Sequence, residues 1–175
     1  MRLSACVALC GVLGTAASQA QSSVEYAVKA AYLAKFAPFI EWPESAFAGP
    51  TAPLTICILG SDPFGADLDK ALAGQKDGEH PLAVRRMTAP DAVVGCHILY
   101  TRDEERAEMT LTDMKTQPVL TVTDSGMRAH GIISFVVIQN HVRFDIDNAA
   151  AEGAGLSISS KLLGLAHAVR QKGAR

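Results

Sequence analysis

The stretch LTICILGSDPFG, residues 54–65, decides the fold class. Its first part, Leu54–Gly60, is a short run of apolar and β-branched residues that ends at a glycine, which is typical of a buried strand. The following Ser61 or Asp62 can cap a helix that has Pro63 at its first position. This segment therefore predicts a strand that leads directly into a helix.

The same alternation of strand and helix continues towards the C-terminus. Further strands are predicted at Pro81–Arg86, Cys96–Thr101 and Pro118–Asp124, and a charged surface helix at Glu104–Lys115. Strands that alternate with helices are the signature of a parallel sheet covered on both faces. The sequence therefore predicts an α/β fold with a mainly parallel sheet between two layers of helices.

The pattern changes in the last third of the chain. The segment Gly131–Asp147 contains two strand-like runs around Gln139 and Asn140, which is typical of an antiparallel hairpin. In the second run apolar and charged residues alternate along the chain: Val142, Arg143, Phe144, Asp145, Ile146 and Asp147. We expect a short helix from Asn148 and a last helix from about Ser159 to Arg170.

The segment Val24–Ala37 is predicted to form a helix that is apolar on most of its sides. Pro38 and Pro43 prevent its continuation. A helix of this kind has to be covered widely, by the body of the domain or by a partner. Its apolar breadth makes a homodimer an expected arrangement.

Residues 1–20 have the features of a secretory signal peptide. Arg2 gives a short positive region, and the apolar core Leu3–Ala17 is too short to span a bilayer. Small residues at Ser18 and Ala20 favour cleavage after Ala20. The alternative is a buried N-terminal helix, but the flanking residues favour export to the periplasm. Residues 21–175 then form a single domain.

Cleavage would leave two of the four cysteines, Cys57 and Cys96. Two cysteines in an oxidising compartment most often pair, so we expect a structural disulfide. Neither cysteine belongs to a CxxC pair, which argues against a metal site.

The composition and the motifs argue against two large classes of protein. The net charge of -2 disfavours a nucleic-acid binder. The chain contains no P-loop, no G-x-S-x-G motif and no H-E-x-x-H motif, and its five histidines lack metal-ligand spacing. A disulfide would consume the thiol of a Cys96–His97 pair, and a helix cap explains Ser61 and Asp62. We therefore predict no enzyme activity, no catalytic residue, no metal and no cofactor.

A binding site is harder to exclude. In doubly wound sheets, ligands bind at the carboxyl ends of the strands, here Gly60–Asp62, Thr101–Asp103 and Thr123–Gly126. Helix N-termini at that edge favour anions, although ordinary turn and cap chemistry explains these residues more simply. Arg143 and Lys161 are a second candidate anion pair, and an exposed strand face with a helix start explains them equally well.

The order of several segments resembles the YfiR family of periplasmic regulators. They are VKAAYLAKFAPFIEWP, ICILGSDPFG, CHILY, PVLTVTD, ISFVVIQNHVRFDID and AGLSISSKLL. The resemblance extends over Val28–Ala166. Its most specific parts are the first helix that leads into Trp-Pro, the RFDI strand and the start of the SSKLL helix.

This resemblance implies a compact flavodoxin-like or Rossmann-like three-layer sandwich, usually dimeric, with a disulfide between Cys57 and Cys96. It also implies a protein that binds the periplasmic part of an inner-membrane diguanylate cyclase and holds it inactive. Release of the cyclase raises cyclic-di-GMP and favours biofilm. An outer-membrane lipoprotein that competes for the protein, a redox change or a small ligand are possible causes of release. Some relatives have a second disulfide, whose cysteines are missing here.

The resemblance also bears on Glu41, Trp42 and Pro43, which follow the first helix. We expect Trp42 to anchor the end of that helix against the sheet rather than to serve only in docking. One edge of its ring can still contribute to an interface. Pro43 fixes the exit of the chain, and Glu41 caps or pairs locally. These three residues are therefore candidates for partner or ligand binding.

Two other functions fit the same sequence. A periplasmic small-ligand carrier, or an accessory protein of a sensor kinase, would have a well-formed pocket for a small anion. An exported hydrolase would depend on Ser61 or His97 for turnover. The export signal and the missing catalytic motifs favour the regulatory binding protein.

Overall fold

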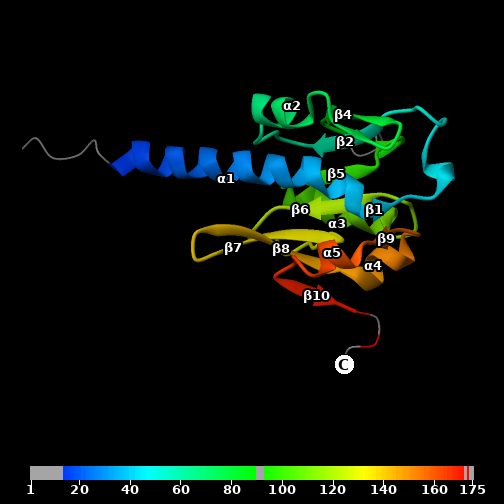
Figure 1. Ribbon diagram of the computed structural model, residues 1–175. Helices are drawn as coiled ribbons and strands as arrows, with labels where there is room; N and C mark the ends of the chain where they lie inside the picture. Colours follow the sequence, from blue (N-terminus) through cyan, green and yellow to red (C-terminus); the bar gives the residue numbers. More distant parts are fainter. Residues whose placement is uncertain (1–13, 90–92, 172, 174–175) are drawn as a thin grey trace, which may run out of the picture.

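The computed structural model describes residues 14–89, 93–171 and 173 (Figure 1). The described helices are α1 (Gly14–Phe36), α2 (Ala66–Leu72), α3 (Glu104–Met114), α4 (Asn148–Gly153) and α5 (Ser160–Leu163), with 3-10 turns at Ala37–Phe39 and Glu44–Ala46. The described strands are β1 (Ile40–Glu41), β2 (Leu54–Leu59), β3 (Lys76–Asp77), β4 (His80–Met87), β5 (Ile98–Thr101), β6 (Leu120–Thr123), β7 (Ile133–Ile138), β8 (His141–Asp147), β9 (Ser157–Ile158) and β10 (Ala168–Arg170).

The main sheet has the strand order β10-β8-β7-β6-β5-β2-β4-β3. Its central strands β4, β2, β5, β6 and β7 are parallel to their neighbours. Counted along the chain, these strands have the spatial order 2-1-3-4-5, which is the flavodoxin-like order. The strand order reverses between β2 and β5. The predicted α/β class and its mainly parallel sheet are confirmed.

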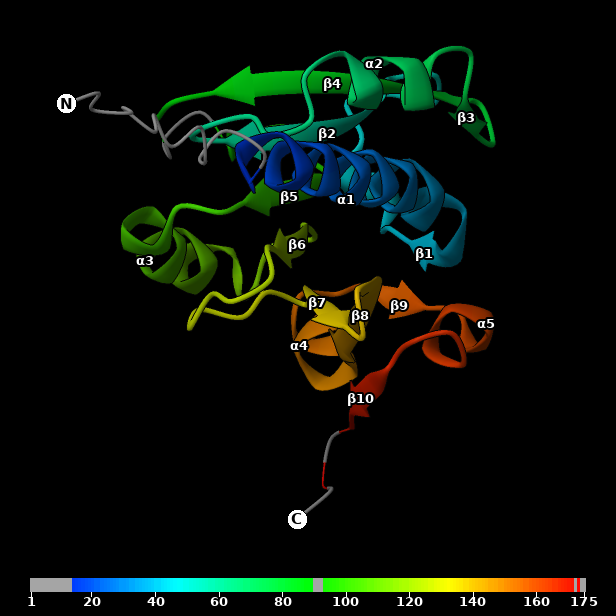
Figure 2. The same ribbon diagram turned by 90° about the vertical axis from the view of Figure 1, so that its left-hand side faces the viewer.

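Helices cover both faces of this sheet, and α1 and α3 lie on opposite sides of β5 (Figure 2). The larger core lies under α1 and α2 and includes Leu33 and Phe36 of α1. The smaller core lies under α3 and includes Leu99 of β5 and Met114 of α3. Successive residues of a strand point to opposite faces, so the buried strands β2 and β5 contribute to both cores.

Helix α1 is longer than the predicted helix Val24–Ala37, because it begins at Gly14, within the predicted signal peptide. It ends before Pro38, as expected, and Pro38 lies in the following 3-10 turn. Residues 1–13 of the signal peptide lie outside the described residues, so cleavage after Ala20 stays a prediction. No helix in residues 14–89 and 93–171 combines the length and the hydropathy needed to cross a membrane.

The C-terminal hairpin is confirmed. Strands β7 and β8 pair antiparallel, with Phe135 opposite Phe144. The two turn residues Gln139 and Asn140 have φ angles of 48° and 64°. Positive φ at both positions is the type I′ geometry, whose twist matches that of the flanking strands. The dipeptide Gln-Asn therefore provides the turn, since asparagine tolerates the left-handed region.

The predicted last helix from Ser159 to Arg170 is wrong over most of its length. Helix α5 spans only Ser160–Leu163, and Ala168–Arg170 form strand β10, parallel to β8. The outer edge of β8 would otherwise present unpaired backbone groups, and pairing with β10 satisfies them. Pairing with β8 therefore overrides the helical propensity of Ala168 and Arg170.

The predicted start of the second helix is also wrong. Helix α2 begins at Ala66 rather than at Pro63. The Asp62 carboxylate accepts hydrogen bonds from the backbone N–H groups of Phe64 and Gly65, so it forms a turn before the helix. The cap geometry needs the acceptor immediately before the first helical residue, and Asp62 lies too far upstream.

A buried ion pair fixes α1 on the sheet. The ammonium group of Lys29 is fully buried and contacts Asp124 Oδ1 at 2.5 Å, Ser125 Oγ at 3.0 Å and the Glu25 carboxylate. Tyr26 also donates a hydrogen bond to Asp124 Oδ2 at 2.8 Å. Burial by itself would raise the pKa of Asp124, but the hydrogen bond and charge of Lys29 outweigh it and lower that pKa. Burial and the bond to Asp124 raise the pKa of Tyr26 to about 12.

Removal of this cation should destabilise the fold. Lys29→Met leaves the Asp124 carboxylate buried without its main partner, and the free energy of unfolding should fall by about 3–5 kcal/mol. Urea unfolding measures the loss. Lys70→Met is the matched control, because the Lys70 ammonium is exposed beside Asp67 and should matter little. The double variant Lys29→Met/Asp124→Leu should recover part of the loss. Equal stability of the Lys29 and Lys70 variants would refute the role of the pair.

Candidate functional site

The predicted disulfide between Cys57 and Cys96 is present. It joins β2 to the segment just before β5, within the smaller core. The two cysteines are 39 residues apart, and a closed loop of that length corresponds to about 4 kcal/mol in the chain-entropy model. The bond therefore stabilises the connection that contains β4.

An arginine contacts both sulfur atoms of this disulfide. Nη2 of Arg85, on β4, lies 3.0 Å from Cys96 Sγ and 3.5 Å from Cys57 Sγ, and it donates to the Val94 carbonyl at 2.6 Å. A guanidinium beside sulfur favours the thiolate form that appears when the bond is reduced. The residues next to Arg85 in the chain do not indicate this contact, so it could not be predicted from the sequence.

The chain after α1 places Glu41, Trp42 and Pro43 in different environments. Glu41 is exposed and lies opposite Ser157 in the small β1–β9 sheet. Trp42 packs half-buried against the larger core, and its Nε1–H is buried without an acceptor among the described residues. The Pro43 carbonyl accepts a hydrogen bond from Ala46 and starts a 3-10 turn. A role of these residues in partner or ligand binding stays a prediction.

Three further rings follow one another beside Trp42. The indole meets the His97 ring edge-on at 6.3 Å between centroids, and Phe47 stacks between His97 at 4.4 Å and His80 at 3.8 Å. Nδ1 of His97 accepts a hydrogen bond from the backbone N–H of Thr55, so the proton of the neutral ring is on Nε2. Burial lowers the pKa of His97. His97 therefore has a structural role at the amino end of β5.

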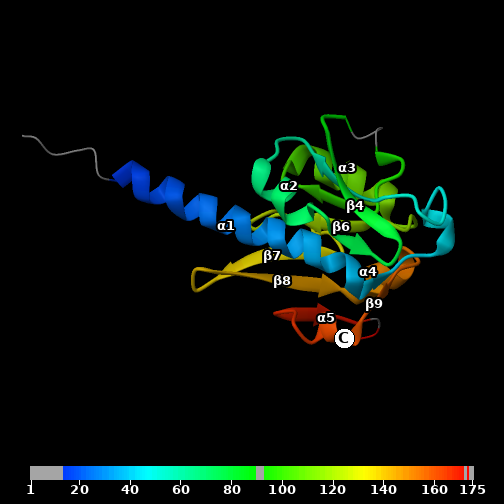
Figure 3. The same cartoon turned by 45° about the horizontal axis from the view of Figure 1, so that its top comes forward.

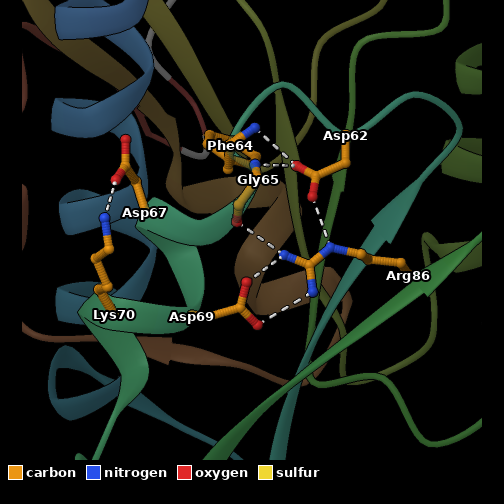
Figure 4. A network of polar contacts seen from close by, with 7 residues as sticks. All are labelled: Asp62, Phe64, Gly65, Asp67, Asp69, Lys70 and Arg86. Atoms are coloured by element: carbon orange, nitrogen blue, oxygen red, sulfur yellow. Dashed lines mark hydrogen bonds and ion pairs between the residues drawn. The ribbon is translucent and has the colours of Figure 1, made fainter.

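The carboxyl edge of the sheet carries the acidic groups expected there, and cations of the same chain hold them. Arg86 contacts Asp62 Oδ2 at 2.6 Å and both carboxylate oxygens of Asp69 (Figure 4). The other pairs at this edge are Asp103 with Arg106, Glu104 with Arg128, and Asp124 with Lys29. The acidic groups at this edge are therefore paired with basic residues of the same chain.

The same edge does not favour an anion. The Asp103 side chain caps α3 by accepting a hydrogen bond from the Arg106 backbone N–H, and Glu104 and Glu105 occupy the first turn. These carboxylates oppose a bound anion at the start of α3. Within residues 14–89 and 93–171, no group of three or more His, Cys, Asp or Glu side chains is arranged to hold a metal ion.

The structure does not bring Arg143 and Lys161 together as an anion site. Arg143 is exposed on β8, and Lys161 is exposed on α5. The described part of the chain records no hydrogen bond or ion pair between them. Arg143 instead lines a hollow of about 360 Å³ between α1 and the hairpin, together with Val28, Tyr32 and Val137.

A second hollow has a volume of about 460 Å³. It lies at the end of α1 and is lined by Phe36, Phe39 and Leu165, among others. Tyr32 lines both hollows. The broad apolar surface of the first helix indicated that α1 needs extensive cover, but no local pattern predicted these two hollows.

Comparison with known proteins gives one family. A family model described as YfiR/HmsC-like matches residues 26–167 of the chain. The match begins in α1, includes the whole main sheet up to β8 and ends just before β10. No curated protein matches the chain.

Arg85 should accelerate reduction of the disulfide. In Arg85→Gln the guanidinium no longer stabilises the leaving thiolate, so reduction by dithiothreitol should slow several-fold. Arg86→Gln, one residue along the same strand, removes the same charge from the opposite side of β4 and should leave the rate unchanged. Thiol release under native conditions measures both. Equal slowing in the two variants would mean that the contact with sulfur has no specific effect.

Acidification should destabilise the protein through His97. Because burial lowers its pKa below the ordinary value of about 6.5, the unfolded chain binds a proton that the folded chain does not. The stability that neutral His97 contributes is complete above about pH 6.5. It is lost as the pH falls through the pKa of His97 in the folded protein. Urea unfolding between about pH 5 and about pH 8 measures it. His97→Asn keeps an acceptor for Thr55 and should lose part of the pH dependence, whereas the exposed-site control His130→Asn should keep it.

Proposed function

The chain belongs to the YfiR/HmsC-like family, and on that premise we propose that it binds the periplasmic part of an inner-membrane diguanylate cyclase and holds that enzyme inactive. In this role the protein is exported, acts in the periplasm and lowers cyclic-di-GMP signalling. In this role it stabilises one conformation of its partner and catalyses no reaction of its own.

The observation that carries this proposal is the family match over residues 26–167, which includes nearly all of the α/β domain. The family is one of periplasmic regulators and is regulatory rather than catalytic. The disulfide between Cys57 and Cys96 fits an oxidising compartment.

The acidic groups at the carboxyl edge of the sheet are already paired within the chain, which favours a protein target over a small ligand. In a doubly wound fold the ligand crevice lies where the strand order reverses, here between β2 and β5. Above that position Phe64 packs edge-on against Tyr100 at 4.6 Å and against Tyr26 at 5.9 Å. Together with the ion pairs of Asp62 and Asp124, these rings take the positions that a ligand would need.

Inhibition by this route requires preferential binding and nothing more. A regulator that binds the inactive conformation of its target more tightly shifts the population towards that state. A difference of about 5.5 kcal/mol moves a two-state equilibrium from 1:99 to 99:1, so a difference of a few kcal/mol has a large effect. An outer-membrane lipoprotein that competes for the same protein would release the cyclase. A homodimer of this chain is compatible with the role.

Cyclic-di-GMP in a deletion strain tests the proposal. The level should rise when the gene is deleted, because the cyclase loses its inhibitor. Expression of the full chain should restore the low level, and a form without residues 1–20 should not, because it stays in the cytoplasm. Mass spectrometry of cell extracts measures the nucleotide. An unchanged level on deletion would reject the cyclase as target and favour a sensor-kinase partner or a ligand carrier.

A further inference from the structure

Helix α1 carries an exposed apolar stripe on its flank, beside the β7–β8 hairpin. Val24 is 62% exposed and Val28 is 39% exposed, and both lie at the spacing of one helix face with Tyr32. Across from them lies the β7–β8 hairpin, whose Val137 is 43% exposed. Figures 1 and 3 show the hairpin extending beside the C-terminal part of α1, while the first turns of the helix project beyond its tip. The helix and the hairpin therefore form the two walls of a hollow.

This hollow and the one at the end of α1 lie along the same helix, and together they are here called the α1 groove. Its residues from α1 extend from Val24 to Phe36, and Tyr32 lines both hollows. At 1.5 Å per residue, this span is about 18 Å long. Leu165, 63% exposed, closes the far end. The groove is long enough for about three turns of a second helix.

Most of the charged residues that line the groove are basic. Lys35, Lys76 and Arg143 line it, and the described residues record no ion pair for any of them. The single carboxylate in the lining is Glu25, which is held by Lys29. The whole chain has a net charge of -2, so this basic rim is a local feature. Such a rim attracts a partner with acidic groups beside its apolar residues.

We propose that the α1 groove binds an amphipathic helix with an apolar stripe and acidic flanks, supplied by the protein partner. The inference rests on the proposed function and locates the surface that performs it. Apolar residues at i and i+4 of the bound helix would fill the two hollows, in the helix-in-groove mode. Its carboxylates would face Lys35, Lys76 and Arg143.

The charges also argue against the other occupants of this surface. In a two-fold symmetric dimer formed through the groove, the same patch of both copies meets, which would bring one basic rim towards the other. An anionic membrane would attract the rim, but a lipid surface is flat and would leave a concave groove between two walls unfilled. An acidic helix satisfies both the shape and the charge.

A pair of synthetic helical peptides tests the inference directly. Both carry leucines at i and i+4, and one has glutamates on its flanks where the other has lysines. In fluorescence anisotropy the acidic peptide should bind the full exported protein at least about tenfold more tightly than the basic one. Val24→Glu and Val28→Glu should each weaken the acidic peptide by about tenfold, and so should Lys35→Glu/Arg143→Glu.

Matched controls come from exposed apolar residues elsewhere. Met109→Glu on α3 and Val94→Glu before β5 change residues that are 60% and 84% exposed, and both should leave peptide binding unchanged. Circular dichroism and urea midpoints verify that each variant folds, and the two valine positions provide independent variants. Equal binding of the two peptides would overturn the proposal. So would loss of dimerisation, or loss of binding to phosphatidylglycerol vesicles, in the groove variants without any effect on the acidic peptide.

The same variants in the deletion strain separate this inference from the function that it rests on. If the wild-type protein restores the low cyclic-di-GMP level and Val28→Glu does so too, the proposed function stands and the α1 groove is not its surface. If the wild-type protein fails to restore the level, the cyclase role fails, and the peptide experiment still decides whether the groove binds acidic helices. Loss of restoration in the groove variants, with full restoration by Met109→Glu, supports both.

Discussion

The ion pair between Lys29 and Asp124 is the contact on which the arrangement of the helices depends. A fully buried ammonium group is costly unless a carboxylate and further hydrogen bonds compensate it. Asp124, at the carboxyl end of β6, provides that carboxylate, with Ser125 and Glu25 around it. If α1 slid or rotated by one residue, both charges would lose their partner inside the protein. The pair therefore determines how far α1 extends over the sheet and which side it presents.

The exposed stripe of α1 follows from this constraint. Successive residues of a helix point about 100° apart, so an inward Lys29 turns Val28 towards the flank. Leu33 and Phe36 then enter the larger core, while Val24 and Val28 remain beside the hairpin. The apolar breadth noticed in the sequence thus has two separate uses. One side of the helix holds the domain together, and the other forms a wall of the α1 groove.

The sequence predicted the parallel strands and the hairpin because their apolar patterns are local, and the Gln139–Asn140 turn has a recognisable composition. It failed for Ala168–Arg170, because that strand exists only through the free edge of β8. Asp62 was predicted to cap a helix, but its side chain pairs with Arg86 on β4, which lies far from it in the chain. Among the candidate site residues, the disulfide followed from counting cysteines. The Arg85 contact and the groove depend on tertiary positions that no local pattern encodes.

A flavodoxin-like sheet usually offers its carboxyl edge to a ligand, because turn residues and helix N-termini there are left without partners. Here that edge is used for stability: Asp124 is held by Lys29, and Asp62 is held by Arg86. The surface left for recognition is the flank of α1, which the ion pair and the packing of Phe36 keep in one position. A preformed groove loses little conformational entropy when a partner binds. A rigid domain of this kind can therefore hold a target in one conformation without chemistry of its own.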